Sequence, residues 1–312
     1  ENLALAVPAA LAGLLLARPV LAAMASARAA SAPMRVSYDL SGDTPHAGQR
    51  LFHQSKARFR CLACGRRWGK DRACEYEVLR LVPQMLNDNQ GKGLVPNVLI
   101  WYVSPTYPLS DITWAELKAF TPRDFIQDVR ESDRLIRCHG GVEIWMKTAV
   151  DPERLVGAGL DLLIVGEAGL IAEEAWTTSL RPTLSSPGRH GLAIFNGTPK
   201  GLNWFHKLYL RGQDPLDTEI ESWNFPTWNN PYISPEEIAK ARAELPEQVF
   251  RQEYGAEFLS DVGLVFRHVD SCIQGQLEGP VQGHAYIAGI DLAKHHDFTV
   301  AIIADKATRR VV

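Results

Sequence analysis

The 312-residue sequence lacks any strong excess of charge, because 33 Lys and Arg residues face 36 Asp and Glu residues and the net charge is −3. This argues against a strongly basic nucleic-acid-binding protein as a whole. Cysteine is also scarce. Of five cysteines, only Cys61 and Cys64 form a C-x-x-C pair, and no second pair follows at a spacing that would complete a zinc site. We therefore expect buried strand cysteines in a reducing cytosol.

Long apolar runs are equally scarce. Only residues 3–24, within an Ala- and Leu-rich stretch over residues 1–33, are long enough to suggest a membrane span or signal peptide, and Arg18 interrupts them. The chain does not begin with Met, and Met24 and Met34 are both plausible starts. We expect a non-functional extension over residues 1–33 and no membrane association. A disordered or helical extension and a true signal or anchor are the alternatives.

The charges that are present are unevenly placed. Residues 46–72 hold eight Lys and Arg but one acid, whereas residues 214–261 hold eleven acids and three bases. The basic segment could bind polyphosphate or DNA. The acidic segment is more typical of a solvated helical surface. Hydrophobic residues make up 46% of the chain, which is enough to bury a core.

Strand and helix signals alternate between about residues 55 and 212, which predicts an α/β fold with a mostly parallel sheet flanked by helices. The predicted strands are residues 59–63, 97–103, 160–165 and 191–195, and the predicted helices are 71–86, 110–120, 173–180 and 202–210. Two alternating runs within residues 135–147 suggest a hairpin. After residue 213 we predict a Trp- and Asn-rich loop, two acidic helices that begin at a Ser234 cap, and strands at 286–291 and 298–304.

Residues 64–71, Cys-Gly-Arg-Arg-Trp-Gly-Lys-Asp, follow the first predicted strand and precede a helix. They are a variant of the phosphate-binding loop G-x-x-x-x-G-K-[ST], with the first glycine displaced to Gly65. Gly65 and Gly69 would allow close backbone approach, so that amides point at phosphate oxygens. Lys70 would reach the β- and γ-phosphates, and two arginines add positive charge. The predicted ATP-binding loop residues are Gly65, Arg66, Arg67, Trp68, Gly69, Lys70 and Asp71.

Two positions depart from the usual nucleotide site. Asp71 replaces the hydroxyl residue that normally binds Mg²⁺. A carboxylate can also ligate Mg²⁺, although it would repel phosphate at close range. The strand at 160–165 is followed by Gly166 and Glu167, where an Asp–Glu pair is usual. Glu167 is the candidate for activating the attacking water, while Gly166 supplies no metal ligand.

Polar residues also follow the next apolar strand. Asn196, Gly197 and Thr198 could sense the γ-phosphate and couple hydrolysis to motion, although Asn-Gly-Thr-Pro alone is a turn signature. Gln49, upstream of the loop, could read the adenine edge. By itself it is a surface glutamine.

Together these segments resemble the large terminase subunit of tailed bacteriophages, the DNA-packaging motor. The resemblance runs from about residue 45 to the end of the sequence and rests on the order and spacing of short pieces. The pieces are residues 45–49, 65–70, 104–107, 160–170, 196–201, 230–233, 250–258 and 289–293.

The resemblance implies a RecA-like ATPase domain of the additional-strand type at residues 34–213. It also implies a helical linker at 214–280 and the start of an RNase H-like nuclease domain at 281–312. Asp291 matches the first metal-binding carboxylate of that nuclease, and Asp297 is a further candidate. A two-metal nuclease needs three or more carboxylates from separate elements. Because the remaining carboxylates would lie beyond Val312, we expect this polypeptide, as given, not to cut DNA.

For the ATPase domain, the resemblance implies three catalytic residues. Arg66 matches the loop arginine that stabilises the transition state in cis, Lys70 the phosphate-binding lysine and Glu167 the catalytic carboxylate. Asn196, Gly197 and Thr198 match the coupling motif.

The resemblance further implies ATP with Mg²⁺ as the ATPase cofactor, and Mg²⁺ or Mn²⁺ for a complete nuclease. The implied partners are double-stranded DNA, a portal protein and a small terminase subunit. The subunits would form a homo-oligomeric ring in the host bacterial cytoplasm, transiently on the procapsid and not in the mature virion. DNA contact would be to the backbone and therefore salt-sensitive.

Two alternatives to a motor ATPase stay open. Family members often carry an arginine where this chain has Val156, and with Asp71 and Gly166 that makes three departures. They favour a degenerate prophage remnant that binds ATP or DNA without turnover. The other alternative is an unrelated P-loop NTPase, such as a helicase or small-molecule kinase. A helicase should show a second RecA-like domain, which the segment after residue 213 does not suggest.

Overall fold

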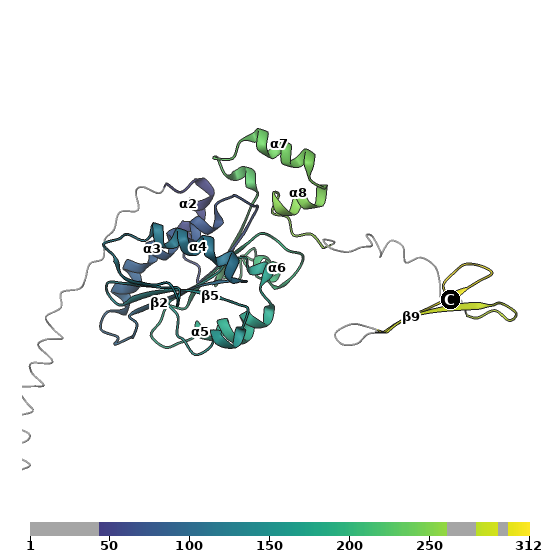
Figure 1. Cartoon of the computed structure of the whole chain (residues 1–312), viewed down its shortest axis with the longest axis horizontal. Helices are drawn as coiled ribbons and strands as arrows, with labels where there is room; N and C mark the ends of the chain where they lie inside the picture. The colour runs from purple at the N-terminus through teal and green to yellow at the C-terminus, as the bar shows by residue number, and fades with distance from the viewer. Residues whose placement is uncertain (1–43, 261–278, 293–298) are drawn as a thin grey trace, which may run out of the picture. The chain divides into compact units, whose positions relative to one another are not determined.

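The structure is a computed structural model that describes residues 44–260, 279–292 and 299–312 (Figure 1). The described residues form two separate compact units, a large one before the segment 261–278 and a small one after it. The predicted extension at 1–33 and Asp297 lie outside the described residues. In the described part of the chain, no helix is long and apolar enough to cross a membrane.

An eight-stranded sheet forms the centre of the large unit, in the order β3-β4-β5-β2-β6-β7-β1-β8. Its strands are β1 Phe59–Cys64, β2 Val98–Ser104, β3 Ile126–Arg130, β4 Leu135–Cys138, β5 Val142–Thr148, β6 Leu162–Val165, β7 Leu192–Gly197 and β8 Ile220–Phe225. The six strands from β5 to β8 in this order pair in parallel, and β3 and β4 add an antiparallel edge. The predicted α/β class with a mostly parallel sheet is therefore confirmed.

Helices cover both faces of this sheet (Figure 1). One face carries α2 Ala47–Gln54, α3 Lys70–Asn89 and α4 Tyr107–Phe120, and the other carries the π-helix η3 Ala175–Leu180, its continuation α5 Arg181–Thr183, and α6 Trp204–Arg211. Short 3-10 turns lie at η1 Pro152–Leu155 and η2 Ala168–Leu170.

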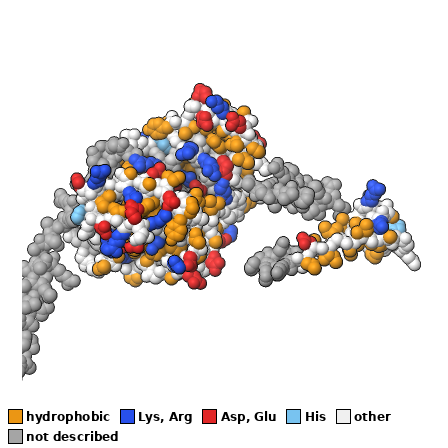
Figure 2. All heavy atoms as spheres, viewed as in Figure 1, with side chains coloured by type: hydrophobic (Ala, Val, Ile, Leu, Met, Phe, Trp, Pro, Cys, Tyr) orange, Lys and Arg blue, Asp and Glu red, His pale blue; other side chains and the backbone are white. Residues whose placement is uncertain are grey.

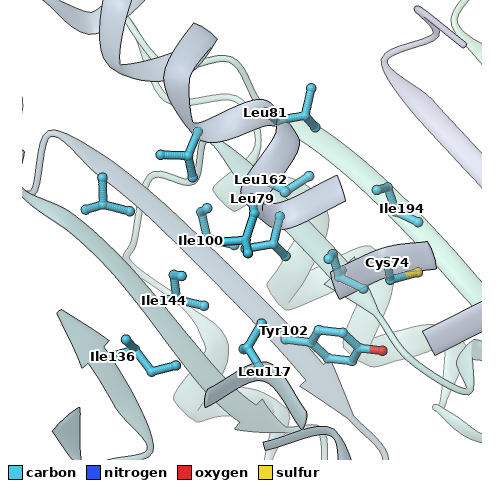
Figure 3. Close-up of a cluster of buried hydrophobic side chains, with 14 of the residues drawn as sticks. Cys74, Leu79, Leu81, Ile100, Tyr102, Leu117, Ile136, Ile144, Leu162 and Ile194 are labelled. Carbon is cyan, nitrogen blue, oxygen red and sulfur yellow. The ribbon is translucent and has the colours of Figure 1, made fainter. Parts of the chain in front are cut away.

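The strand side chains alternate between two buried clusters. In β1, Leu62 and Cys64 join the cluster under α3 and α4, whereas Cys61 and Ala63 join the cluster on the opposite face. Figure 3 shows part of the first cluster, where side chains of α3 and α4 meet those of the strands. Burial on both faces explains why central strands such as β2 and β6 are nearly continuous apolar runs. The four described cysteines are buried and free. Cys61, Cys64 and Cys138 are strand residues, as predicted, whereas Cys74 lies in α3.

The sheet continues past residue 213, because β8 pairs in parallel with β1. Along the chain, β8 is followed by η4 Thr227–Asn229, α7 Pro235–Glu244 and α8 Glu247–Glu253. The predicted cap of α7 is confirmed, since the hydroxyl of Ser234 accepts a hydrogen bond from the Glu237 amide at 3.2 Å. The small unit is an antiparallel pair, β9 Tyr286–Asp291 and β10 Val300–Asp305.

Candidate nucleotide-binding site

Adjacent parallel strands bring most of the predicted site residues to one edge of the sheet. The order β2-β6-β7-β1 places the carboxyl ends of these strands side by side. The loop follows β1, Glu167 follows β6, and Asn196 and Gly197 end β7. Ligands in open α/β sheets bind outside the carboxyl ends of the strands. Because β7 lies between β1 and β6, the predicted coupling residues stand between the loop and Glu167.

A cleft of about 530 Å³ opens at this edge. It is lined by Arg66, Arg67, Gly69, Lys70, Asp71, Arg72, Tyr102, Ser104, Pro105, Leu109, Ile112, Thr113, Glu116, Gly166, Glu167 and Tyr254. Five of the predicted loop residues and Glu167 are among them. Gln49, Gly65, Trp68 and the Asn196–Thr198 segment lie outside this lining.

Lys70 is the charged centre of the cleft. Its ammonium lies 2.8 Å from Oε1 of Glu167 and 3.5 Å from Oδ2 of Asp71. Burial opposes the charge on Lys70, but the two neighbouring carboxylates raise its pKa above the usual value. Lys70 is therefore a fixed cation, held at the start of α3, where the helix N-terminus also favours anions.

Glu167 is tied to the predicted coupling residues. Its backbone amide donates to Oδ1 of Asn196 at 3.3 Å, and its Oε2 accepts from the amide of Thr198 at 3.3 Å. Glu167 also has a φ of 48°, in the left-handed region that non-glycine residues seldom adopt. Strained backbone of this kind persists only where the surroundings fix it. The acid and the end of β7 are thus one connected unit.

The predicted phosphate-binding loop is held in place by hydrogen bonds and close packing with residues that follow β8. The Arg66 amide donates to the Glu253 carbonyl, and the Thr227 hydroxyl donates to the Arg66 carbonyl, both at 2.7 Å. A Cβ on Gly65 would lie 2.5 Å from Thr227 Oγ1 and from the Tyr254 carbonyl oxygen. Close approach of this segment therefore requires glycine at position 65. From the sequence alone, Gly65 is explained only by the close approach of its backbone to phosphate.

The side chain of Arg66 forms an ion pair with Glu253 of α8. Glu253 also accepts a hydrogen bond from Lys200, which follows β7. Although burial opposes ionisation of Glu253, the hydrogen bonds from Lys200 and Arg66 lower its pKa to about 2. A single carboxylate thus joins the loop, the β7 extension and α8.

Two of the predicted ATP-binding residues, Gln49 and Trp68, do not line the cleft and instead contact other parts of the protein. Gln49 donates to the Gly69 carbonyl at 2.9 Å and accepts from the His46 amide at 3.0 Å, so both ends of its amide hold the loop. Trp68 is fully buried and stacks on Phe225 with ring centroids 4.8 Å apart. Recognition of adenine by Gln49 stays a prediction.

The predicted basic segment over residues 46–72 does not form one free surface. Arg60 is buried and pairs with Glu77 at 2.7 Å, and Arg58 pairs with Glu219 at 2.8 Å. Figure 2 shows Lys and Arg side chains interspersed with acidic ones over the visible face. Within this segment, the basic residues that line the cleft are Arg66, Arg67, Lys70 and Arg72.

Several cleft residues carry no motif signal and were not predicted. Tyr102 of β2 and Glu116 of α4 line the cleft, and so does Tyr254, which follows α8. Tyr102 could have been found, because it sits near the carboxyl end of a predicted strand. Glu116 and Tyr254 could not, because helix and linker residues give no local indication of what they face. Asp291, at the end of β9 in the small unit, is exposed, and its metal role stays a prediction.

Known proteins resemble this chain in sequence. The chain is 29% identical over 317 residues to the large terminase subunit of Thermus virus P23-45, covering 88% of this chain and 63% of that protein. It is 32% identical over 179 residues to the large terminase subunit of Escherichia phage T5, covering 56% of this chain and 40% of that protein. The chain is therefore similar in sequence to phage large terminase subunits.

Solved structures of large terminases resemble this chain in fold. The large terminase ATPase domain of Thermus phage P74-26 superposes with a TM-score of 0.58 at 26% identity, over 70% of this chain and 95% of that one. The large terminase of a thermophilic bacteriophage, solved in complex with ADP, shares the fold at 14% identity, with a TM-score of 0.54 over 69% of this chain and 54% of that one. No family model matches the chain. The chain spans less than two thirds of the length of the two curated large terminase subunits.

Proposed function

We propose that this chain is the ATPase-bearing part of a large terminase subunit, which hydrolyses ATP to move double-stranded DNA into a procapsid. The observation that carries the proposal is the 2.8 Å contact between Lys70, at the start of α3, and Glu167, which follows β6, in a cleft beside the phosphate-binding loop. The thermophilic phage terminase in complex with ADP has the same fold, which supports a nucleotide as the ligand here.

The proposed roles follow from where each group lies. Lys70 and the loop amides would hold the β- and γ-phosphates, and Glu167 would orient the attacking water and accept its proton. Arg66 would approach the γ-phosphate from the rim of the cleft, while Glu253 limits its positions. Mg²⁺ would neutralise phosphate charge when bound. Movement of Glu167 would reach Asn196 and Thr198 through the hydrogen bonds that join them.

The proposed partners follow from the family. We propose a ring of subunits that engages a portal protein and a small terminase subunit in the host cytoplasm and contacts the DNA backbone. Nuclease function is proposed for Asp291 only within a complete nuclease domain.

Turnover of ATP by the full 312-residue chain, with and without double-stranded DNA, tests the ATPase proposal. We expect Mg²⁺-dependent phosphate release that the variant Lys70→Ala abolishes. Release at equal rates by the chain and by Lys70→Ala would refute the motor ATPase. Nucleotide binding without turnover would instead support the remnant suggested by Gly166 and Val156.

A further inference from the structure

The ring of Tyr102 occupies the space beside Gly166. A Cβ added to Gly166 would lie 2.8 Å from Cε1 of this ring and 3.3 Å from its hydroxyl oxygen. The first distance is shorter than real side chains allow, so any larger residue at position 166 would have to displace Tyr102. Gly166 is not in a positive-φ conformation, and its requirement is therefore one of space. An acidic residue at 166 would therefore require the Tyr102 ring to move.

The hydroxyl of Tyr102 has a defined direction. Asn196 accepts from the Glu167 amide through Oδ1, which directs its Nδ2 at the Tyr102 oxygen, 3.3 Å away. The phenol oxygen therefore accepts from Asn196, and its proton is free to be donated. It points at Oδ1 of Asp71, also at 3.3 Å.

Asp71 is the carboxylate best placed to meet a metal bound to nucleotide phosphates. It lies in the first turn of α3 and lines the cleft. One of its oxygens faces Tyr102, and the other lies 3.5 Å from the ammonium of Lys70. Mg²⁺ prefers oxygen ligands and is commonly held by one or two carboxylates together with substrate phosphates. The usual acidic ligand, from the end of the strand, cannot be supplied by Gly166.

We propose that Tyr102 is a positioning residue that holds Asp71 as the carboxylate ligand of nucleotide-bound Mg²⁺. In this arrangement the metal ligand has moved from the end of β6 to the start of α3, and the Tyr102 ring fills the space that the usual acid would occupy. The inference rests on the proposed function, because it requires a nucleotide in the cleft. It also explains why Asp71 and Gly166 depart from the usual pattern together.

The variant Tyr102→Phe tests the proposal, because it keeps the ring beside Gly166 and removes only the hydroxyl. We would measure binding of a fluorescent ADP analogue to the full chain in EDTA and across a Mg²⁺ titration. We expect unchanged binding in EDTA and about a 10-fold higher Mg²⁺ requirement, from the loss of one hydrogen bond to a charged group. Asp71→Asn should abolish the Mg²⁺ response. The control Tyr209→Phe removes a hydroxyl from α6, on the opposite face of the sheet.

A second experiment moves the carboxylate from position 71 back to position 166 and tests whether the metal ligand can be supplied from either place. In an Asp71→Ser background, the pair Tyr102→Leu and Gly166→Asp should restore the Mg²⁺ response, whereas Gly166→Asp with Tyr102 intact should not. Circular dichroism would establish that each variant is folded. A Tyr102→Phe variant with the Mg²⁺ response of the unmodified chain would overturn the inference and leave the proposed function standing. If the unmodified chain binds no nucleotide analogue, both the inference about Tyr102 and the proposed function are contradicted.

Discussion

The ammonium of Lys70 lies 2.8 Å from Oε1 of Glu167, which connects the start of α3 to the end of β6. The other oxygen of the same carboxylate accepts a hydrogen bond from the Thr198 amide. A phosphate bound at Lys70 would compete with Glu167 for the ammonium. Nucleotide binding would then release Glu167 for catalysis and alter its contact with Thr198. Under the proposed function, the end of β7 would then respond directly to the nucleotide.

Lys70→Ala should weaken nucleotide binding. The ammonium is a buried, fixed cation, and a hydrogen bond to a charged group contributes about 1.5–3 kcal/mol, so we expect a loss of about 10- to 100-fold in affinity. Fluorescence titration with an ATP analogue would measure it. Lys207→Ala is the matched control, because Lys207 is an exposed residue of α6 that forms an ion pair with Glu173. Equal affinity of the two variants would remove Lys70 from the binding site.

Glu167→Gln should separate binding from turnover. Loss of a general base costs about 10²- to 10⁴-fold in rate. Nucleotide affinity should be retained or increased, because Lys70 no longer pairs with the Glu167 carboxylate and keeps only the longer contact with Asp71. Phosphate release and analogue binding would be measured on the same preparation, with Glu173→Gln as the surface control. Unchanged turnover would show that another group activates the water.

The core of the candidate site could be predicted from the sequence because its signals are local. Each of β1, β6 and β7 is an apolar run that ends in polar or glycine residues, and parallel strands bring their carboxyl ends together. Lys70, Glu167 and Asn196 follow from this rule without any knowledge of long-range contacts. Their mutual distances, which decide what they can do, come only from the structure.

The supports of the site could not be predicted, because they depend on packing between distant segments. Glu253 reaches Arg66 from α8, and Thr227 reaches the loop from η4. β8 was missed as a strand because Ile220–Phe225 mixes polar and apolar residues and runs into the Trp- and Asn-rich stretch that was interpreted as a loop. Its place in the sheet is set by pairing with β1. Tyr102 lies in a predicted strand, but its contact with Gly166 and its hydrogen bonds with Asp71 and Asn196 come only from the structure.

Glu253→Gln should impair both stability and turnover. It removes the negative charge shared by Arg66 and Lys200, whose side chains are 65% and 23% exposed, so we expect a loss of about 1–2 kcal/mol in unfolding free energy. Turnover should fall more than nucleotide affinity, because Arg66 loses the partner that limits its positions. Urea unfolding and phosphate release would measure the two effects.

The control for Glu253 is Glu257→Gln, which breaks an exposed ion pair with Arg251. Such pairs contribute about 0–1 kcal/mol, and neither member of this one lines the cleft. If both variants lost the same stability and neither changed turnover, Glu253 would be an ordinary surface partner.

Two fully buried glutamates on α3 should give stability opposite dependences on pH. For Glu77, burial opposes ionisation, but hydrogen bonds from His53 and Arg80 lower its pKa to about 2, so its contribution is present above about pH 4.5 and lost as the pH falls toward 2. Burial, with the charge of Glu116, raises the pKa of Glu75 to about 9, so folding binds a proton there and stability falls as the pH rises from 4.5 to 9.

Glu75→Gln should therefore stabilise the protein at alkaline pH and leave it nearly unchanged at about pH 4.5. The slope that it removes is at most about 1.4 kcal/mol per pH unit. Arg72, 3.6 Å from Glu75, offsets part of the cost of ionisation, so we expect a gain of about 1–3 kcal/mol at about pH 8. Urea unfolding at about pH 5 and about pH 8 would measure this gain. Glu77→Gln is the matched control and should destabilise the protein at both values, because it weakens buried ion pairs. A Glu75→Gln variant less stable than the unmodified chain at the alkaline value would show that Glu75 is ionised and paired in the folded state.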